Sequence, residues 1–130
     1  MIKNTSMQPR RSFIFVPGLR PDMFPKALAS GVDIVCVELE DGIAPKDKAE
    51  ARQKALALFS KPQPNDGVER IVRINSMREK FGIEDVNAIL SAKTPPPALM
   101  MPKVRSPDEV KMLDQLLSEA GHDTRLHVII

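Results

Sequence analysis

The stretch that most constrains this chain is residues 33–42, which read Asp-Ile-Val-Cys-Val-Glu-Leu-Glu-Asp-Gly. An apolar run of strand-forming residues that ends in three carboxylates and a glycine is typical of a buried strand that brings acids to the edge of a sheet. Side chains alternate along a strand, which divides the stretch into one face with Ile34, Cys36, Glu38 and Glu40 and another with Val35, Val37, Leu39 and Asp41. Because apolar residues fall on both faces, we expect a parallel strand that is covered on both sides.

Strand and helix patterns alternate along the rest of the chain. Short apolar runs predict strands at residues 12–16, 33–42, 69–75, 98–104 and 126–130. Helical spacing and end signals predict helices at residues 21–30, 46–60, 82–93 and 107–120. In the second of these, Ala49, Leu56 and Phe59 are expected on the buried stripe. The last begins with Ser106 as N-cap and Glu109 as its capping-box partner.

This alternation predicts an α/β fold with parallel strands joined by right-handed crossovers, either a doubly wound sheet or a (β/α)8 TIM barrel. The chain has 130 residues, whereas a complete barrel needs about 250. Five strands and four helices would therefore form the N-terminal part of a barrel. We expect a flexible leader at residues 1–12 and a partial barrel domain at residues 13–130, truncated at its C-terminus.

Composition narrows the partners and the compartment. The net charge is only +2, and Trp and Tyr are absent, so neither a nucleic acid nor a membrane surface is an expected partner. The single cysteine, Cys36, cannot form an internal disulfide and is expected to be a core thiol in a reducing compartment. No apolar run approaches the roughly 20 residues of a membrane span, and no signal-peptide pattern is present. We therefore expect a cytoplasmic protein, with an organelle as the alternative if a targeting segment has been removed.

Functional groups should gather at the carboxyl ends of the strands, as in other α/β folds. In chain order, the strand ends supply Arg20, then Glu38, Glu40 and Asp41, then Arg73 and Asn75, and finally Lys103. Arg73 lies in an otherwise apolar strand, where a guanidinium must be paired. It can form an ion pair with Glu38 or Glu40, or serve as a fork for a substrate carboxylate or an enolate oxygen. The two uses can coexist.

Three further cations lie near the same edge. Lys48 and Arg52 are four residues apart and share a helix face close to the helix N-terminus, where an anion would be favourable. Lys26 can add a charge from the preceding helix. The alternative for each is a solvated basic surface. His122 and His127 have no ligand-like spacing and are interpreted as structural, so any metal would be an oxygen-bound ion such as Mg²⁺.

Five segments then carry a resemblance to a known family. They are RSFIFVPG at 11–18, VELEDGIAP at 37–45, DKAEAR at 47–52, VRIN at 72–75 and MPKV at 101–104. Each segment alone is weak, but the ordered set is specific. The chain resembles the citrate lyase β-subunit-like branch of the HpcH/HpaI aldolase superfamily, which includes malyl-CoA and citramalyl-CoA lyases.

The resemblance implies a Mg²⁺-dependent carbon–carbon lyase that acts on a 3-hydroxyacyl-CoA thioester or a citrate-type acid through an enolate. The position matching Arg73 binds the substrate carboxylate and stabilises the enolate. Positions matching Phe15, Lys26, Lys48 and Arg52 lie along the acyl-CoA site, with Arg20 as a further candidate. The acids matching Glu40 and Asp41 support the arginine and the metal, and Glu38 is a third candidate for that role.

The chain departs from the family pattern in two ways. Glu38 replaces the Asp that many relatives carry, and the chain ends where the first direct metal ligand, a Glu after the fifth strand, would follow. We therefore expect no direct metal ligand in this chain, no activity from it alone, and a homo-oligomer. Two alternatives remain: a non-catalytic CoA-binding or assembly protein of the same fold, and a receiver-like α/β signalling module. The receiver is disfavoured because receivers carry their acids after the first and third strands, whereas the acids of this chain follow the second strand and the third carries Arg73.

Overall fold

The computed structural model describes residues 7–130, which form a five-stranded parallel sheet and four α-helices. The strands are β1 (Phe13–Pro17), β2 (Ile34–Glu38), β3 (Glu69–Arg73), β4 (Ala98–Met101) and β5 (Arg125–Val128). The helices are α1 (Phe24–Leu28), α2 (Lys48–Leu58), α3 (Lys80–Ser91) and α4 (Pro107–Glu119). Short 3-10 turns, η1 (Pro21–Met23) and η2 (Pro45–Asp47), precede α1 and α2.

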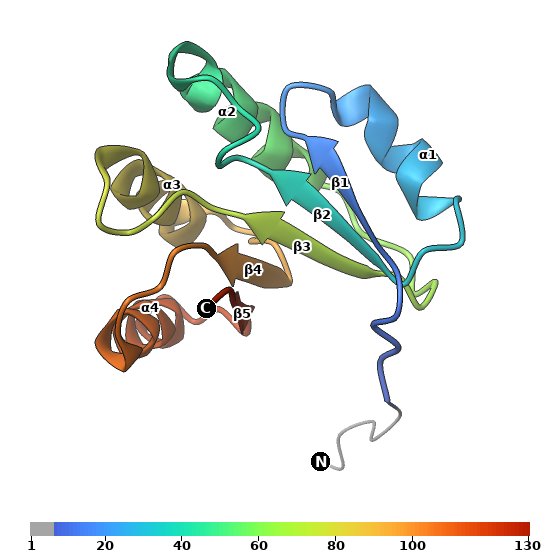
Figure 1. Cartoon of the computed structure of the whole chain (residues 1–130). Coiled ribbons are helices and arrows are strands. Elements are labelled where there is room, and N and C mark those ends of the chain that lie inside the picture. The colour runs from blue at the N-terminus through green and yellow to red at the C-terminus, as the bar shows by residue number, and fades with distance from the viewer. Residues whose placement is uncertain (1–6) are drawn as a thin grey trace.

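Strand order decides between the two expected architectures. The strands pair in chain order, β1-β2-β3-β4-β5, and every pairing is parallel. Doubly wound sheets, including the receiver type, reverse direction and place β1 inside the sheet, whereas a barrel adds each strand to the same side. Figure 1 shows the strands side by side and the helices along one side of a curved sheet. The fold is therefore the N-terminal part of a (β/α)8 barrel.

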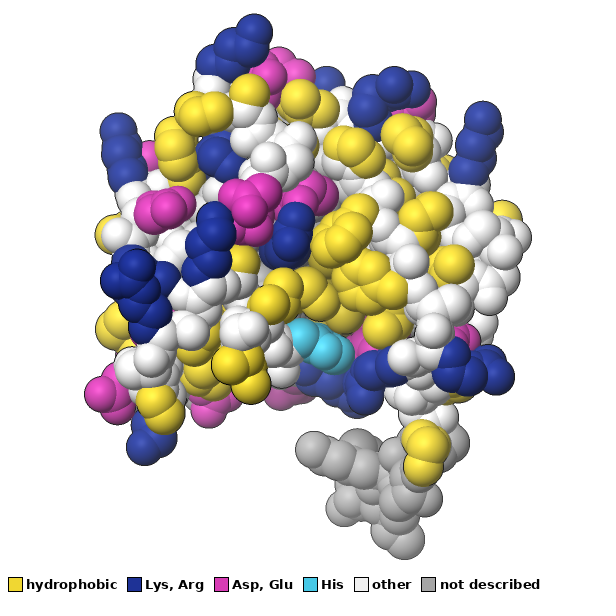
Figure 2. Space-filling view, viewed as in Figure 1, with side chains coloured by type: hydrophobic (Ala, Val, Ile, Leu, Met, Phe, Trp, Pro, Cys, Tyr) yellow, Lys and Arg dark blue, Asp and Glu magenta, His cyan; other side chains and the backbone are white. Residues whose placement is uncertain are grey.

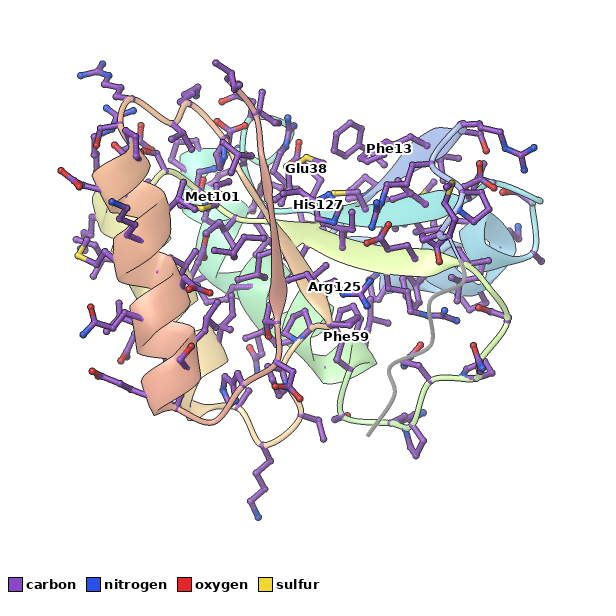
Figure 3. The ribbon with its side chains drawn as sticks, turned by 90° about the horizontal axis from the view of Figure 1, so that it is seen from below. Phe13, Glu38, Phe59, Met101, Arg125 and His127 are labelled. Atoms are coloured by element: carbon purple, nitrogen blue, oxygen red, sulfur yellow. The ribbon has the colours of Figure 1, made fainter. Side chains whose placement is uncertain are left out.

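Alternation along β2 divides the core into two layers, as the sequence predicts. Val35, Val37 and Leu39 pack into the main core, between the sheet and the helices. Ile34 and Cys36 belong to a second cluster with Ile71 and Ala98 on the concave side, which we call the inner face. All five residues of β2 are buried. Figure 3 shows Phe13 and Glu38 on the opposite side of the sheet from Phe59, which lies on the helix side.

Part of the inner face and both edge strands are apolar and exposed. Phe13 and Phe15 of β1 are 38% and 43% exposed, and Val128 and Ile129 at β5 are 40% and 38% exposed. Figure 2 shows an apolar patch in the middle of this view, with acidic and basic side chains along one border and a histidine along the other. Isolated sheet edges of this kind are normally covered, and barrels cover them by closing.

Several boundaries differ from the predicted ranges. β2 ends at Glu38 and β3 at Arg73, so Glu40, Asp41 and Asn75 lie in the loops that follow. The helix predicted at residues 21–30 is shorter and begins as a 3-10 turn. α3 begins at Lys80, two residues earlier than expected. None of the described helices is long and apolar enough to cross a membrane.

Two predicted helix details are wrong. Ser106 is the N-cap of α4 but makes no side-chain capping bond, and the Glu109 carboxylate instead accepts hydrogen bonds from Arg105 N and Arg78 Nε. In α2, Ala49 is exposed, and the buried face carries Lys48, Ala51 and Ala55. Lys48 and Arg52, which the sequence suggested could bind an anion, therefore lie on the side of α2 that packs against the rest of the protein.

Hydrogen bonds at the N-terminal ends of the strands attach the last residues of the expected leader to the sheet. Residues 1–6 lie outside the described residues, but Arg10 Nε donates to Glu69 Oε1 at 2.6 Å, and Arg11 N donates to Asp33 Oδ2 at 2.8 Å. His127 Nε2 lies 3.0 Å from Glu69 Oε2. Burial raises the pKa of Glu69, but the hydrogen bond from Arg10 and the proximity of His127 outweigh it and lower the pKa overall. His127 thus has a structural partner.

Gly82 fixes the position of α3. A Cβ atom at this position would overlap the carbonyl group of Ser76 in the loop after β3. Only glycine therefore allows α3 to pack this closely against the loop, and this loop follows directly from Asn75.

We predict that Gly82→Ala destabilises the chain by about 1–3 kcal/mol, because the added methyl group forces the helix away from the loop. In an exposed helix the same change would stabilise by up to about 1 kcal/mol. Urea unfolding followed by circular dichroism measures the difference. Asn87→Ala, at an exposed position of the same helix, is the control and should change stability by less than about 0.5 kcal/mol. An unchanged Gly82→Ala midpoint would contradict the close packing.

Candidate functional site

The arginine predicted to be functional ends β3 on the inner face. Pairing of β2 with β3 places Glu38 directly beside Arg73. Arg73 Nε donates to Glu38 Oε1 at 2.9 Å, and Nη2 donates to Oε2 of the same carboxylate. The two side chains are 18% and 8% exposed. These hydrogen bonds raise the pKa of Arg73, against the opposing effect of burial. The expected ion pair is thus present, bidentate and largely shielded from water.

Phe15 covers one side of the Arg73 guanidinium. The Arg73 Cζ atom lies 4.6 Å from the Phe15 ring centroid, a cation–π distance. Phe13 in turn packs edge-on against Phe15, with 4.8 Å between ring centroids. Among the described residues, no hydrogen bond involves Arg73 Nη1. The guanidinium is therefore held in one plane by Glu38 and Phe15 and keeps one nitrogen available for another acceptor.

A second group of charges lies at the ends of β2 and β4. Lys103 Nζ is 2.6 Å from Glu40 Oε2 and 2.9 Å from Asp41 Oδ1, while Arg73 Nε is 3.6 Å from Glu40 Oε1. The hydrogen bond from Lys103 lowers the pKa of Asp41. The hydrogen bonds to Glu40 and Asp41 raise the pKa of Lys103. Glu40 therefore bridges the two cations through its two oxygens.

Lys48 is buried beneath this cluster rather than exposed at the helix N-terminus. Its ammonium donates to Leu39 O at 3.1 Å, Glu40 O at 2.8 Å and Asn75 Oδ1 at 2.7 Å. These three acceptors use all three of its protons. Lys48 thus connects α2 to the loops after β2 and β3 and fixes the backbone at Glu40.

Arg52 and Asp85 extend this buried network to α3. Asp85 is 0% exposed, and its carboxylate accepts hydrogen bonds from Arg52 Nε at 2.7 Å, Asn75 N at 2.8 Å and Asn75 Nδ2 at 2.7 Å. Arg52 also lies 3.6 Å from Glu84. Lys48 and Arg52 do share a helix face, as predicted, but this face meets the protein interior. Their predicted role in CoA binding is untested, and both have partners within the chain.

The remaining two candidates lie beside β1. Arg20 forms an exposed ion pair with Asp22 at 2.9 Å. Together with Lys26 and Phe15, Arg20 lines a pocket of about 400 Å³ between β1 and α1. A second pocket, of about 560 Å³, lies among the loops after β2, β3 and β4 and is lined by Glu40, Asp41, Lys48, Asn75 and Lys103, among others. The structure therefore places the predicted residues in two neighbouring regions.

The acidic residues do not form a metal site by themselves. No group of three or more His, Cys, Asp or Glu side chains in residues 7–130 is arranged to hold a metal ion. Glu38, Glu40 and Asp41 instead contact Arg73 and Lys103. Cys36, beneath them, is free and buried. Burial raises the pKa of its thiol to about 12, with a further contribution from the charge of Glu38. This agrees with the predicted core thiol.

Asp85 is the site residue that sequence reasoning missed. A signal was present, because Gly82, Asp85, Val86 and Ile89 follow helical spacing and all four are buried. An acid on the apolar stripe of a helix must find donors in the interior, and Asn75 and Arg52 supply them. Lys103 was placed correctly at a strand end, but its contacts with Glu40 and Asp41 were not predicted.

Comparison with known families identifies the chain. The family model described as HpcH/HpaI aldolase/citrate lyase matches residues 11–129. The chain belongs to this family. The sequence resemblance is thus confirmed. The segments that carry it contain the charged residues at the strand ends, among them Glu40, Arg73 and Lys103.

Relatives in the HpcH/HpaI family include several lyases. The chain is 33% identical to the mitochondrial citramalyl-CoA lyase of Homo sapiens over 103 residues, which cover 79% of this chain and 30% of the relative. It is 36% identical to the L-malyl-CoA/beta-methylmalyl-CoA lyase of Cereibacter sphaeroides over 113 residues, or 85% of this chain and 35% of the relative. The chain thus spans about a third of the length of these curated relatives.

Solved structures of the family support the same fold. The citrate lyase beta subunit of M. tuberculosis, complexed with oxaloacetate and magnesium, matches with a TM-score of 0.63 and 29% identity, covering 92% of this chain and 49% of that chain. Protein CitE from Mycobacterium tuberculosis in complex with magnesium, acetoacetate and coenzyme A matches with a TM-score of 0.64 and 29% identity, covering 91% and 40% respectively. Magnesium is therefore the metal of the family, which agrees with the cofactor expected from sequence.

The buried network makes a prediction for Asp85. Replacing Asp85 by Asn keeps its size but turns an amide NH₂ toward groups that are themselves donors, and leaves Arg52 without its closest charge partner. We expect a loss of about 2–4 kcal/mol in the free energy of unfolding, measured by urea denaturation. Asp114→Asn, an exposed change on α4, should have almost no effect. Equal effects of the two substitutions would contradict the network.

Proposed function

We propose that the protein is a Mg²⁺-dependent carbon–carbon lyase that acts on citramalyl-CoA, malyl-CoA or a related citrate-type acid. The observation that carries this proposal is the Arg73 guanidinium, held by Glu38 and Phe15 at the carboxyl ends of the strands. This is the functional edge of a barrel, and the named relatives act on substrates of the same class. Because the chain spans only part of these relatives, the activity of the whole protein rests on the experiment below.

Arg73 would bind the carboxylate beside the bond that breaks. In such a cleavage, the hydroxyl group loses its proton, the carbon–carbon bond breaks, and its electron pair moves onto the acyl fragment as an enolate, which is then protonated. A guanidinium fixed in one plane, with Nη1 unused among the described residues, can donate to a carboxylate or to the developing oxyanion without reorganising. Glu38 keeps the guanidinium in place and balances its charge.

The metal enters the proposal only for the complete protein. The described acids contact Arg73 and Lys103, and no metal-ligating group of three is present among residues 7–130. We therefore assign Glu38, Glu40 and Asp41 to supporting the cations and assign no step to a metal within this chain. The direct ligands would come from the rest of a barrel.

The acyl-CoA would approach from the side of β1. Lys26 and Arg20 line the exposed pocket between β1 and α1, where a basic side chain can reach a phosphate group. Lys48 and Arg52 are less available because each already contacts oxygens within the chain.

The exposed apolar residues of β1 and β5 support the further proposal that other strands cover these edges. Association of the protein with copies of itself stays a prediction.

The test is turnover in a completed barrel. We would join residues 11–129, the segment that the family model matches, to the remaining strands of human citramalyl-CoA lyase, and assay cleavage of citramalyl-CoA and malyl-CoA with Mg²⁺. Arg73→Lys keeps the charge but loses the planar fork, so we expect turnover to fall by about 10²-fold or more. Arg105→Lys, at an exposed position, is the control and should retain activity. Near-normal turnover in the Arg73→Lys protein would show that Arg73 is only a structural ion pair.

A further inference from the structure

Lys103 has a backbone conformation that a lysine rarely adopts. Its φ angle is +52°, and among the described residues it is the only non-glycine residue with a positive φ. A side chain in this left-handed region is unfavourable because Cβ approaches the carbonyl oxygen that follows. Strain of this kind tends to persist where a side chain has to be held in a particular place.

Arg78 holds the backbone of Lys103 in this conformation. Arg78 Nη2 donates to the Lys103 carbonyl oxygen at 2.5 Å, and Arg78 Nε donates to Glu109 Oε1 of α4 at 2.8 Å. Arg78, from the loop after β3, therefore holds the Lys103 carbonyl group, and Glu109 of α4 holds Arg78 in turn. As a result, the ammonium extends over the loop after β2, where Glu40 and Asp41 accept from it.

The two cations that meet at Glu40 differ in how easily they can change partner. Arg73 and Glu38 are 18% and 8% exposed, so breaking their pair would leave a charge shielded from water without a partner. Lys103 and Asp41 are 52% and 69% exposed, and an exposed ion pair of this kind is weak. A ligand can therefore displace the Lys103–Asp41 contact at little cost while Arg73 stays in place.

Their positions suit an acid with two carboxylates. Arg73 and Lys103 approach the two different oxygens of Glu40, with Nε 3.6 Å from Oε1 and Nζ 2.6 Å from Oε2. Lys103 lines the pocket of about 560 Å³ among the strand-end loops, and Arg73 lies on the inner face beside it. One ligand can thus contact Arg73 at one end and Lys103 at the other.

We propose that Lys103 is a second substrate-binding cation, which binds the distal carboxylate of a dicarboxylic substrate or product while Arg73 binds the carboxylate next to the reacting carbon. This inference rests on the proposed function and narrows its substrates to the citrate-type acids, whose cleavage releases a four-carbon dicarboxylic keto acid. Lys103 selects four-carbon dicarboxylic acids over monocarboxylic acids of similar size, and its strained backbone keeps the ammonium within reach of the ligand.

The test compares two four-carbon keto acids, oxaloacetate and 2-oxobutyrate, by isothermal titration calorimetry on the 130-residue chain. They share the carboxylate beside the keto carbon, and only oxaloacetate carries the distal one. Lys103→Gly removes the ammonium and also relieves the left-handed backbone. We expect its Kd for oxaloacetate to rise about tenfold, as for one lost charge-assisted hydrogen bond. Its Kd for 2-oxobutyrate should change less than about twofold, which would show that the rest of the site is intact.

Two further variants make the result specific. Lys103→Arg keeps the charge and should retain most of the preference for oxaloacetate. Lys93→Gly removes a lysine from an exposed bend between α3 and β4, and both Kd values should match those of the unmodified chain. This control separates the loss of net charge from the loss of a local contact.

Three results would overturn the inference. Lys103→Gly could bind oxaloacetate as tightly as the unmodified chain, or it could lose affinity for both acids equally, which would reduce Lys103 to a structural partner of Glu40. The unmodified chain could also bind oxaloacetate no better than 2-oxobutyrate. None of these results decides whether the protein is a lyase, because turnover in the completed barrel judges that separately.

Discussion

The site depends on one ion pair, between Arg73 and Glu38, at the ends of two neighbouring apolar strands. A guanidinium at the end of an apolar strand is stable only with a partner of opposite charge and good geometry. Parallel pairing of β2 with β3 brings Glu38 beside Arg73, so the register of the sheet itself satisfies this need. The stacked Phe15 ring from β1 then fixes the plane of the guanidinium. Side chains of the three neighbouring strands β1, β2 and β3 therefore determine together where the Arg73 guanidinium lies.

Residues of the helices impose a second constraint, on the loops that follow β2 and β3. Lys48 of α2 and Asp85 of α3 hold the loops after β2 and β3 by hydrogen bonds to their backbone and to Asn75. The loop after β2 carries Glu40 and Asp41, which contact Lys103. The helices of this barrel segment thus cover the sheet and also set the positions of the acids at its functional edge. Close packing of α3 at Gly82 maintains this arrangement.

Much of this could be predicted from sequence because it depends on local patterns. Alternation of side chains along residues 33–42 predicted which residues of β2 share a face, and the structure shows which face meets the helices. The need to pair Arg73 predicted its contact with Glu38 or Glu40. The choice between a doubly wound sheet and a barrel could not be derived from alternation, because both have the same order of strands and helices along the chain. The family resemblance favoured the barrel, and strand order established it.

The helix contacts were harder to predict because they depend on how each helix docks. Lys48 and Arg52 were assigned to an anion site from their spacing, but α2 is rotated so that both face the interior. Small alanines at positions 51 and 55 allow this close approach, and the sequence pattern did not distinguish them from exposed Ala49. Glu109 was expected to cap Ser106, yet Arg78 binds it from another loop. Contacts between distant segments therefore account for most of the errors.

The central claim is that Arg73 is a carboxylate-binding group held ready by Glu38 and Phe15. Nuclear magnetic resonance on the ¹⁵N-labelled chain can test this directly through the Arg73 Nε–Hε signal, during a titration with oxaloacetate. The account predicts a saturable shift of this signal together with the Phe15 ring protons, while the Arg70 Nε–Hε signal, from a side chain bound to Gln63 and Asp66, stays unchanged. An Arg73 signal that does not respond, or that moves only in parallel with Arg70, would contradict it.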